Sequence, residues 1–257
     1  MRLRPSSDAS RNWWSETGSF TVEDGSQETS FIHIGDPQAQ SAAQYDTFAT
    51  LIEKAYEMYD SDFIIDTGDN VDHGDNFRQW QWLLDEASDT LMNTVLMSAS
   101  GNHEDMGTNA IDKNFVYSNV PEQDVSTGIY CSFDYNNIHF AILNTNDLDD
   151  DDSLSDEQIE WLKEDLSHID KDTPVIVASH SPYRKLEMSK GKWYTGTVTS
   201  NAQEVLTLLK GFSHVEIFAG HRHVNNFVDH KAEGFDYAGD SALGKPTGID
   251  IKEYKIT

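Results

Sequence analysis

Residues 63–72 read FIIDTGDNVD, an apolar run followed by a glycine and two spaced aspartates. The first four residues, Phe63–Asp66, have the length and composition of a buried β-strand. Gly68 directly precedes Asp69, and a glycine lets the chain turn sharply and bring the next side chain back over the end of the strand. The stretch therefore predicts a buried strand whose end presents a carboxylate.

The same layout recurs along the chain. Gly35, Gly68, Gly101 and Gly220 each lie at, or within a few residues of, the end of an apolar run, and each directly precedes a polar residue. In α/β sheets, sites form outside the carboxyl ends of strands, where loops converge. Such carboxylate, amide and imidazole groups are metal ligands, and core packing requires none of them. The residues at these predicted strand ends are Asp36, Asp69, Asn102, His103, His180, His221 and His223.

Composition narrows the class of protein. The chain has 257 residues, 37 % of them hydrophobic, which is enough for one sizeable core and too rich for disorder. Its apolar runs are shorter than the roughly 20 residues of a membrane span. With 18 Lys and Arg against 45 Asp and Glu, the net charge is −27, which argues against nucleic acid as a large partner. A small phosphorylated substrate is compatible with this charge where bound metal supplies positive charge locally.

Strand-like and helix-like patterns alternate from Phe31 onward, which predicts an α/β domain. The apolar runs predicted as strands are Phe31–Ile34, Phe63–Asp66, Val95–Ser98, Ile138–Leu143, Val175–Ala178 and Val215–Phe218. Helices are predicted at Ala42–Tyr59, Phe77–Leu84, Asp89–Asn93, from the capping box Ser155–Gln158 through Leu166, and at Asn201–Lys210. The acidic run Asp147–Glu157, which leads into one of these helices, is interpreted as a solvated loop.

Residues 1–28 differ from the remainder, residues 29–257. They alternate aromatic and polar side chains and then become turn-rich, which predicts one or two strands and a linker. Two such strands do not fold alone. They either dock on the main domain or form the tail of a further β-domain. The residues after Met1 show no apolar segment of the kind found in a signal peptide.

Three motifs carry a resemblance to a known family. Gly68–Asp72 matches GDxxD, Gly101–Glu104 matches GNH(D/E), and Gly220–His223 matches GHxH. Each motif alone is weak, but their order and spacing over about residues 30–230 resemble the calcineurin-like metallophosphoesterase family. The resemblance implies a four-layer αββα sandwich of two mixed β-sheets flanked by helices. It also implies hydrolysis of phosphate esters with two divalent metal ions, for which Mn, Fe and Zn all fit.

The resemblance also assigns roles. Asp69 would bridge both metals, Asp36 and His223 would bind one of them, and Asn102, His180 and His221 would bind the other. A metal-bridging hydroxide would attack phosphorus in line, while His103 assists the leaving group. Two neighbouring residues, Asp72 and Glu104, are further catalytic candidates that would orient His103. Substrate-binding candidates after His180 are Tyr183 and Arg184, with Trp193 and Tyr194 as aromatic neighbours.

The chain departs from the family pattern at two positions. The first motif, normally Asp-x-His, reads Asp36-Pro37-Gln38, so a neutral amide replaces an imidazole. Gln38 is therefore predicted as a weaker ligand, or as a position beside a loosely held ion. Asp72 stands where purple acid phosphatases place a tyrosine ligand, so the protein is not expected to be purple. It is assigned to a bacterial, purple-acid-phosphatase-like branch without that ligand.

The stretch WWSETGSFTV, residues 13–22, resembles the last strand of the fibronectin-like domain that precedes the catalytic domain in such proteins. The chain is therefore expected to be part of a longer, exported or cell-surface bacterial protein. Two alternatives to a general phosphatase stay open. One is a catalytically silent, metal-binding surface module. The other is a phosphodiesterase that acts on nucleotides or lipid headgroups.

Overall fold

The computed structural model describes most of the chain between residues 28 and 223 and several shorter segments around it. The described residues are 17–20, 28–105, 115, 121, 128–147, 152–189, 192–197, 199–223, 226–229, 238–242 and 252–256. The strands predicted within residues 1–28 lie almost wholly outside this set, so their prediction is not tested. No helix in the described part of the chain is long and apolar enough to cross a membrane.

Two β-sheets form the centre of the molecule. The first has the order β12-β1-β2-β3, in which β1, β2 and β3 run parallel and β12 is antiparallel to β1. Its strands are β1 (Thr29–Ile34), β2 (Phe63–Asp66), β3 (Val95–Ser98) and β12 (Lys252–Ile256). This sheet is mixed because a C-terminal strand completes it.

The second sheet is also mixed and has the order β10-β11-β9-β6-β5-β4. Its inner strands run parallel, while β4 is antiparallel to β5 and β10 is antiparallel to β11. The strands are β4 (Cys131–Tyr135), β5 (Ile138–Leu143), β6 (Val175–Ser179), β9 (Val215–Ala219), β10 (Asn226–Asp229) and β11 (Ala238–Ala242). A separate hairpin consists of β7 (Arg184–Ser189) and β8 (Lys192–Thr197).

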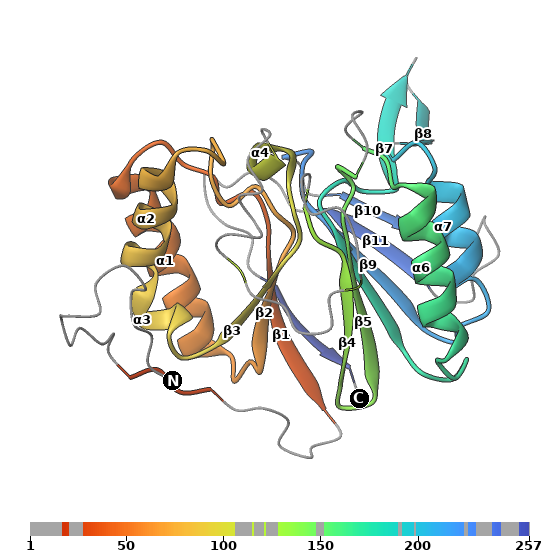
Figure 1. Cartoon of the computed structure of the whole chain (residues 1–257), viewed down its shortest axis with the longest axis horizontal. Helices are drawn as coiled ribbons and strands as arrows, with labels where there is room; N and C mark the ends of the chain where they lie inside the picture. The colour runs from red at the N-terminus through yellow and green to blue at the C-terminus, as the bar shows by residue number, and fades with distance from the viewer. Residues whose placement is uncertain are drawn as a thin grey trace.

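Helices cover the outer face of each sheet, which gives the four layers that the family resemblance implies (Figure 1). The helices beside the first sheet are α1 (Ala42–Met58), α2 (Phe77–Glu86) and α3 (Ser88–Leu91). Those beside the second sheet are α6 (Asp156–Ser167) and α7 (Ala202–Leu209). The predicted strands and helices are therefore confirmed to within a few residues at their ends.

Strand alternation explains why two sheets stack. In β1, Phe31 faces the second sheet, whereas Ile32 packs under the helices of the first. The Phe31 ring stacks on Phe63 at 5.7 Å and meets Phe140 and Phe218 edge-on at 6.0 and 5.6 Å between ring centroids. These four fully or nearly buried rings fill the space between the sheets, and such aromatic contacts add to the burial of apolar area.

Parallel strands place their carboxyl ends together. In Figure 1, β1, β2 and β3 end near α4 (Asn102–Asp105) at the top of the molecule, on the side where β5 and β9 also end. The loops after β1, β2, β3, β6 and β9 carry all the polar residues that the sequence marks as strand-end ligands. The fold therefore gathers these residues at one edge.

Candidate metal centre

Unusual backbone conformations mark the edge where the loops converge. Asp36, Asp69, His221 and His223 all have positive φ angles, of 55°, 57°, 65° and 50°. A non-glycine residue rarely adopts this left-handed conformation, which costs free energy and is concentrated at functional sites. The loops therefore hold these four residues in an unfavourable backbone conformation that directs their side chains toward the site.

Two of the glycines are needed for close approach. A Cβ atom at Gly101 would lie against the amide nitrogen and Oδ1 of Asp69. A Cβ atom at Gly220 would lie 2.5 Å from Oδ2 of Asp36, which is too close for any real side chain. Because neither position has a side chain, loops from different strands can pack their functional groups against one another.

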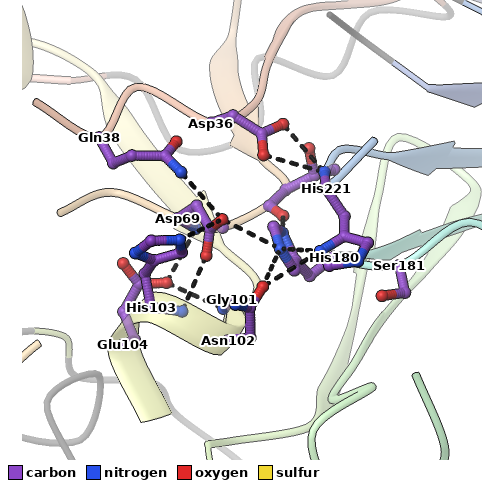
Figure 2. A network of polar contacts seen from close by, with 12 residues as sticks. Asp36, Gln38, Asp69, Gly101, Asn102, His103, Glu104, His180, Ser181 and His221 are labelled. Carbon is purple, nitrogen blue, oxygen red and sulfur yellow. Dashed lines mark hydrogen bonds and ion pairs between the residues drawn. The ribbon is translucent and has the colours of Figure 1, made fainter. Parts of the chain in front are cut away.

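One cluster of donor atoms combines two imidazoles and an amide. Oδ1 of Asn102 lies 3.0 Å from Nε2 of His180 and 3.1 Å from Nδ1 of His221, and the two ring nitrogens are themselves 3.1 Å apart. Figure 2 shows the three side chains pointing toward one another. Ligand atoms bound at right angles about 2.1 Å from one ion are separated by about 3 Å, so this triangle fits a shared cation.

A second cluster combines two carboxylates and an imidazole. The ligand atoms of Asp36, Asp69 and His223 all lie within 4.8 Å of one another. Nε2 of His223 is 3.1 Å from Oδ1 of Asp36, whose carboxylate also accepts from the backbone N–H of His221 at 2.9 and 3.0 Å. This cluster is richer in oxygen than the first, which suits a harder cation.

Asp69 lies between the two clusters. Its Oδ2 is 3.2 Å from Nε2 of His180, and its Oδ1 accepts a hydrogen bond from the backbone N–H of His103 at 3.0 Å. The same Oδ2 also accepts from Nε2 of Gln38 at 3.1 Å. Asp69 therefore belongs to the second cluster and contacts His180 of the first, which is the position a metal-bridging ligand requires.

Gln38 presents an unsatisfied oxygen. The side chain is nearly buried, and its Oε1 has no hydrogen-bond partner among the described residues. A buried carbonyl oxygen without a partner costs about 1–3 kcal/mol. An amide oxygen is a suitable ligand for a hard divalent cation, so the orphaned atom fits the predicted metal role of Gln38.

Charge at this edge favours a cation. Burial by itself raises the pKa of Asp69, but the charges of His180 and His103 and hydrogen bonds from them outweigh it and lower the pKa to about 2. Burial likewise lowers the pKa of His180, yet the carboxylates of Asp69 and Asp36 raise it to about 10. The raised pKa of His180 shows that the carboxylates of Asp69 and Asp36 stabilise positive charge between them. A bound metal ion would supply that charge.

The ring of His103 is oriented by Asp72. Nδ1 of His103 lies 2.6 Å from the backbone carbonyl oxygen of Asp72, so it carries the proton that it donates there. The Asp72 carboxylate is 3.9 Å from the same nitrogen, and its Oδ2 accepts from Nε2 of Gln40 at 2.8 Å. Nε2 of His103 therefore faces the opposite way, 3.9 Å from Oδ2 of Asp69, on a side chain that is 26 % exposed.

Glu104 supports Asp69. Its Oε2 accepts from the backbone N–H groups of Asp69 and Gly101 at 2.8 and 2.9 Å, and its Oε1 accepts from that of Val71 at 3.1 Å. Burial, with the nearby charge of Asp69, raises the pKa of Glu104 to about 8. These contacts link the loops after β2 and β3. They point to positioning of Asp69 by Glu104; the orienting of His103 by Glu104 stays a prediction.

The two substrate-binding candidates are buried. Tyr183 is part of the hydrophobic core under α6 and α7. The guanidinium of Arg184 donates to the backbone oxygen of Tyr183 and to Oε1 of Gln203, both at 3.1 Å. These contacts account for the burial of both side chains, and substrate binding by them stays a prediction. The side chains of Trp193 and Tyr194 lie outside the described part of the structure.

A buried carboxylate that the sequence reading missed lies beneath the site. Oδ2 of Asp66 accepts from Oγ of Ser98 at 2.5 Å and from Nδ2 of Asn70 at 2.7 Å, and Oδ1 accepts from the N–H of Gly68 at 3.2 Å. Burial raises the pKa of Asp66 to about 7. The network fixes the turn that presents Asp69. In the sequence, the carboxylate of Asp66 at the end of the apolar run Phe63–Asp66 was the feature that could have marked it as a site residue.

Comparison with known proteins identifies the family and the fold. The profile of the calcineurin-like phosphoesterase family matches residues 29–225. Among solved structures, a purple acid phosphatase from yellow lupin seeds superposes with a TM-score of 0.69 at 16 % identity, covering 90 % of this chain and 47 % of that one. A search of curated proteins found no match.

Two further structures share the fold. GAP50, the anchor in the inner membrane complex of Plasmodium, superposes with a TM-score of 0.59 at 16 % identity, covering 90 % of this chain and 81 % of its own. A 5′-nucleotidase candidate from Staphylococcus aureus gives 0.52 at 18 % identity, covering 90 % and 51 %. The chain thus spans about half the length of the lupin and staphylococcal proteins. The match over residues 29–225 shows that this chain belongs to the calcineurin-like phosphoesterase family.

Proposed function

We propose that this chain hydrolyses phosphate esters with the help of two divalent metal ions. The observation that carries the proposal is the convergence of seven donor side chains on one edge, beside the ring of His103. Asp36, Gln38 and His223 would hold one ion, Asn102, His180 and His221 the other, and Asp69 would contact both. Mn, Fe and Zn all suit this mixture of oxygen and imidazole donors.

When bound, two such ions neutralise phosphoryl oxygens and lower the pKa of water. The chain's own residues supply the positioning. The positive φ angles of Asp36 and Asp69 and the strand ends before them hold the two carboxylates rigidly. Glu104 ties the backbone of Asp69 to the loop that carries Asn102. A preorganised site of this kind lowers the barrier because little rearrangement accompanies the reaction.

His103 would assist the leaving group. Because its Nδ1 donates to the Asp72 carbonyl, its Nε2 is the nitrogen turned toward Asp69, on a side chain that is 26 % exposed. A protonated His103 in this orientation donates the Nε2 proton to the departing ester oxygen. General acid catalysis of this kind contributes about 10²- to 10⁴-fold to a rate.

A metal-binding but catalytically silent module is the second candidate. It is favoured by one observation, the similarity in fold to GAP50, which is described as an anchor. That similarity, at 16 % identity, concerns the fold alone. The placement of His103, held by Asp72 with its free nitrogen toward Asp69, favours the enzyme, because a silent module has no use for it.

Hydrolysis of p-nitrophenyl phosphate and of its bis ester, with Mn²⁺ added, separates these candidates. The wild-type protein is expected to hydrolyse at least one ester, and the ratio of the two rates distinguishes a phosphomonoesterase from a phosphodiesterase. His103→Ala should reduce kcat about 10²- to 10⁴-fold. His168→Ala is the matched control, since His168 is an exposed histidine at the end of α6. Metal-loaded protein that is inert as both wild type and His103→Ala would support the silent module.

A further inference from the structure

The acidic run Asp147–Glu157 is not only a solvated loop. Residues 148–151 lie outside the described set, but both flanking carboxylates make specific contacts. Oδ2 of Asp147 accepts from Nε2 of Gln158 at 2.9 Å and from the backbone N–H of Ser155 at 3.3 Å. At the other end of the segment, Asp152 points toward the metal centre. The interpretation of the run as solvated is therefore incomplete.

The backbone around Asp152 is firmly held. Its carbonyl oxygen accepts from the N–H of Ser200 at 2.8 Å, and the next N–H, of Ser153, donates to Thr145 at 2.9 Å. Leu154 exchanges two hydrogen bonds with the side chain of Asn201, at 2.7 and 3.2 Å. Asp152 itself has a φ of 67°, the same left-handed conformation as the four residues that aim their side chains at the site.

The Asp152 carboxylate lies between neighbours of two proposed ligands. Its Oδ1 accepts a hydrogen bond from Oγ of Ser181, the residue directly after His180. The same oxygen is 3.5 Å from Nε2 of His221, an ion-pair distance. The Asp152 side chain is 27 % exposed. Its carboxylate is therefore partly shielded from water, and its electrostatic interaction with the His221 imidazole is screened less than that of a fully exposed pair.

The two ring nitrogens of His221 face different partners. Nδ1 lies in the triangle with Asn102 and His180, whereas Nε2 faces Asp152. A neutral imidazole carries its proton on one nitrogen only, so Nδ1 has a lone pair for a metal when the proton is on Nε2. In His180 the two nitrogens have the opposite roles. Its Nδ1 lies 2.8 Å from the carbonyl oxygen of Thr67 and donates its proton there, so the lone pair of Nε2 faces the cluster.

We propose that Asp152 positions His221 for metal binding, by accepting its Nε2–H and so presenting Nδ1 to the ion shared with Asn102 and His180. Ser181 holds the carboxylate in place by donating to it. Carboxylate partners of this kind orient a metal-ligating histidine and raise its basicity, and their loss costs about 10- to 100-fold in metal affinity. The inference rests on the proposed function only in requiring that the site bind metal.

Calorimetric titration of the metal-free protein with Zn²⁺ alone tests the proposal. Asp152→Ala should weaken one of the two binding events about 10- to 100-fold. Asp152→Asn, which keeps an acceptor oxygen without the charge, should lose less Zn²⁺ affinity than Asp152→Ala. Glu157→Gln removes one exposed carboxylate of the same run and should match wild type. An Asp152→Ala affinity within twofold of wild type would overturn the proposal, as would an equal loss in Glu157→Gln.

A second readout separates positioning from general charge. In the Zn²⁺-loaded wild type, nitrogen-15 NMR should show the His221 proton on Nε2 and exchanging slowly with water, and Asp152→Ala should exchange it faster. Where Asp152→Ala does not fold, Ser181→Ala takes its place, with a smaller expected loss of affinity. Wild-type protein that binds Zn²⁺ but hydrolyses no ester would refute the proposed function and leave the role of Asp152 standing. Wild type that binds no metal would refute both.

Discussion

Gln38 is the residue at which this chain departs most clearly from its family. Its amide bonds Asp69 while its Oε1 has no partner among the described residues. Gln38→His would place an imidazole, a stronger ligand for Zn²⁺ than a neutral amide, beside Asp36 and Asp69. We expect this variant to bind one of two Zn²⁺ ions at least tenfold more tightly in calorimetry. Gln81→His, which adds an imidazole on the exposed face of α2, is the control and should leave the affinity for both Zn²⁺ ions unchanged.

Glu104 is predicted to be a positioning residue. Its carboxylate accepts three backbone N–H groups, from Asp69, Val71 and Gly101. Glu104→Gln replaces one acceptor oxygen by an N–H donor, so at least one buried N–H loses its partner. The free energy of unfolding in urea should fall by about 1–3 kcal/mol. Glu86→Gln, at the exposed end of α2, should leave it unchanged; an equal stability of Glu104→Gln and wild type would contradict the role.

Local pattern predicted some site residues and missed others for a physical reason. Asp36, Asp69 and His221 each follow a glycine at the end of an apolar run, so the neighbouring sequence reveals them. Neither Asp66 nor Asp152 follows a glycine, so this pattern does not mark them. One partner of each carboxylate, Ser98 for Asp66 and Ser181 for Asp152, lies about 30 positions away along the chain and becomes a neighbour only in the folded structure.

At the scale of elements, His139 on β5 joins β4 to α6. Its Nδ1 lies 2.9 Å from Asp134 and its Nε2 lies 2.8 Å from Asp165, on a side chain that is 3 % exposed. Burial lowers the pKa of His139, but hydrogen bonds to Asp165 and Asp134 and their charges outweigh it and raise the pKa. Both nitrogens therefore act as donors, which requires the imidazolium form.

This contact predicts a pH dependence. Because the folded-state pKa of His139 is raised, its contribution to stability is fully present below the unfolded pKa of about 6.5 and is lost as the pH rises through the folded pKa. The difference in free energy of unfolding between wild type and His139→Gln should shrink accordingly from pH 5.5 to pH 9. The exposed His168→Gln should show no such trend. A constant difference across this range would contradict the imidazolium assignment.

Helix α6 shows how far sequence predicts an element. Ser155 caps it as predicted, with Oγ accepting from the N–H of Gln158 at 3.1 Å. The other half of the capping box is absent, because the Gln158 side chain bonds the backbone of Asn144 and Oδ2 of Asp147 instead. Asp147 takes the position at the Ser155 N–H. A tertiary contact thus replaced a local one, which a sequence pattern does not reveal.

At the scale of the whole molecule, alternation of strands and helices predicted an α/β domain but not two stacked sheets. The same pattern fits a single sheet covered on both faces. The arrangement of two stacked sheets was predicted only from the resemblance to the calcineurin-like metallophosphoesterase family. The physical cause lies in the large apolar side chains on both faces of β1 and β2, such as Phe31 and Ile32, since one face packs on helices and the other on the second sheet.

Metal removal should lower stability without unfolding the chain. The three hydrophobic layers, two under helices and one between the sheets, do not depend on the ions. Ions present at 100 times their Kd stabilise a protein by about 2.7 kcal/mol per site. For a domain of this size, each kcal/mol shifts Tm by about 2–4 °C. Scanning calorimetry should therefore show Tm rising by about 5–10 °C for each bound ion with Mn²⁺ over protein in chelator; an identical Tm would contradict metal binding.

We propose that two bound ions and His103 together make this edge of the sheets a phosphoesterase. Titration of metal-free protein with Mn²⁺, above its Kd and with p-nitrophenyl phosphate hydrolysis followed at each step, tests it most directly. We expect the rate to reach its plateau at two equivalents, and we expect His103→Ala to bind two equivalents but to turn over about 10²- to 10⁴-fold more slowly. A plateau at one equivalent, full activity in chelator, or no hydrolysis with two ions bound would contradict it.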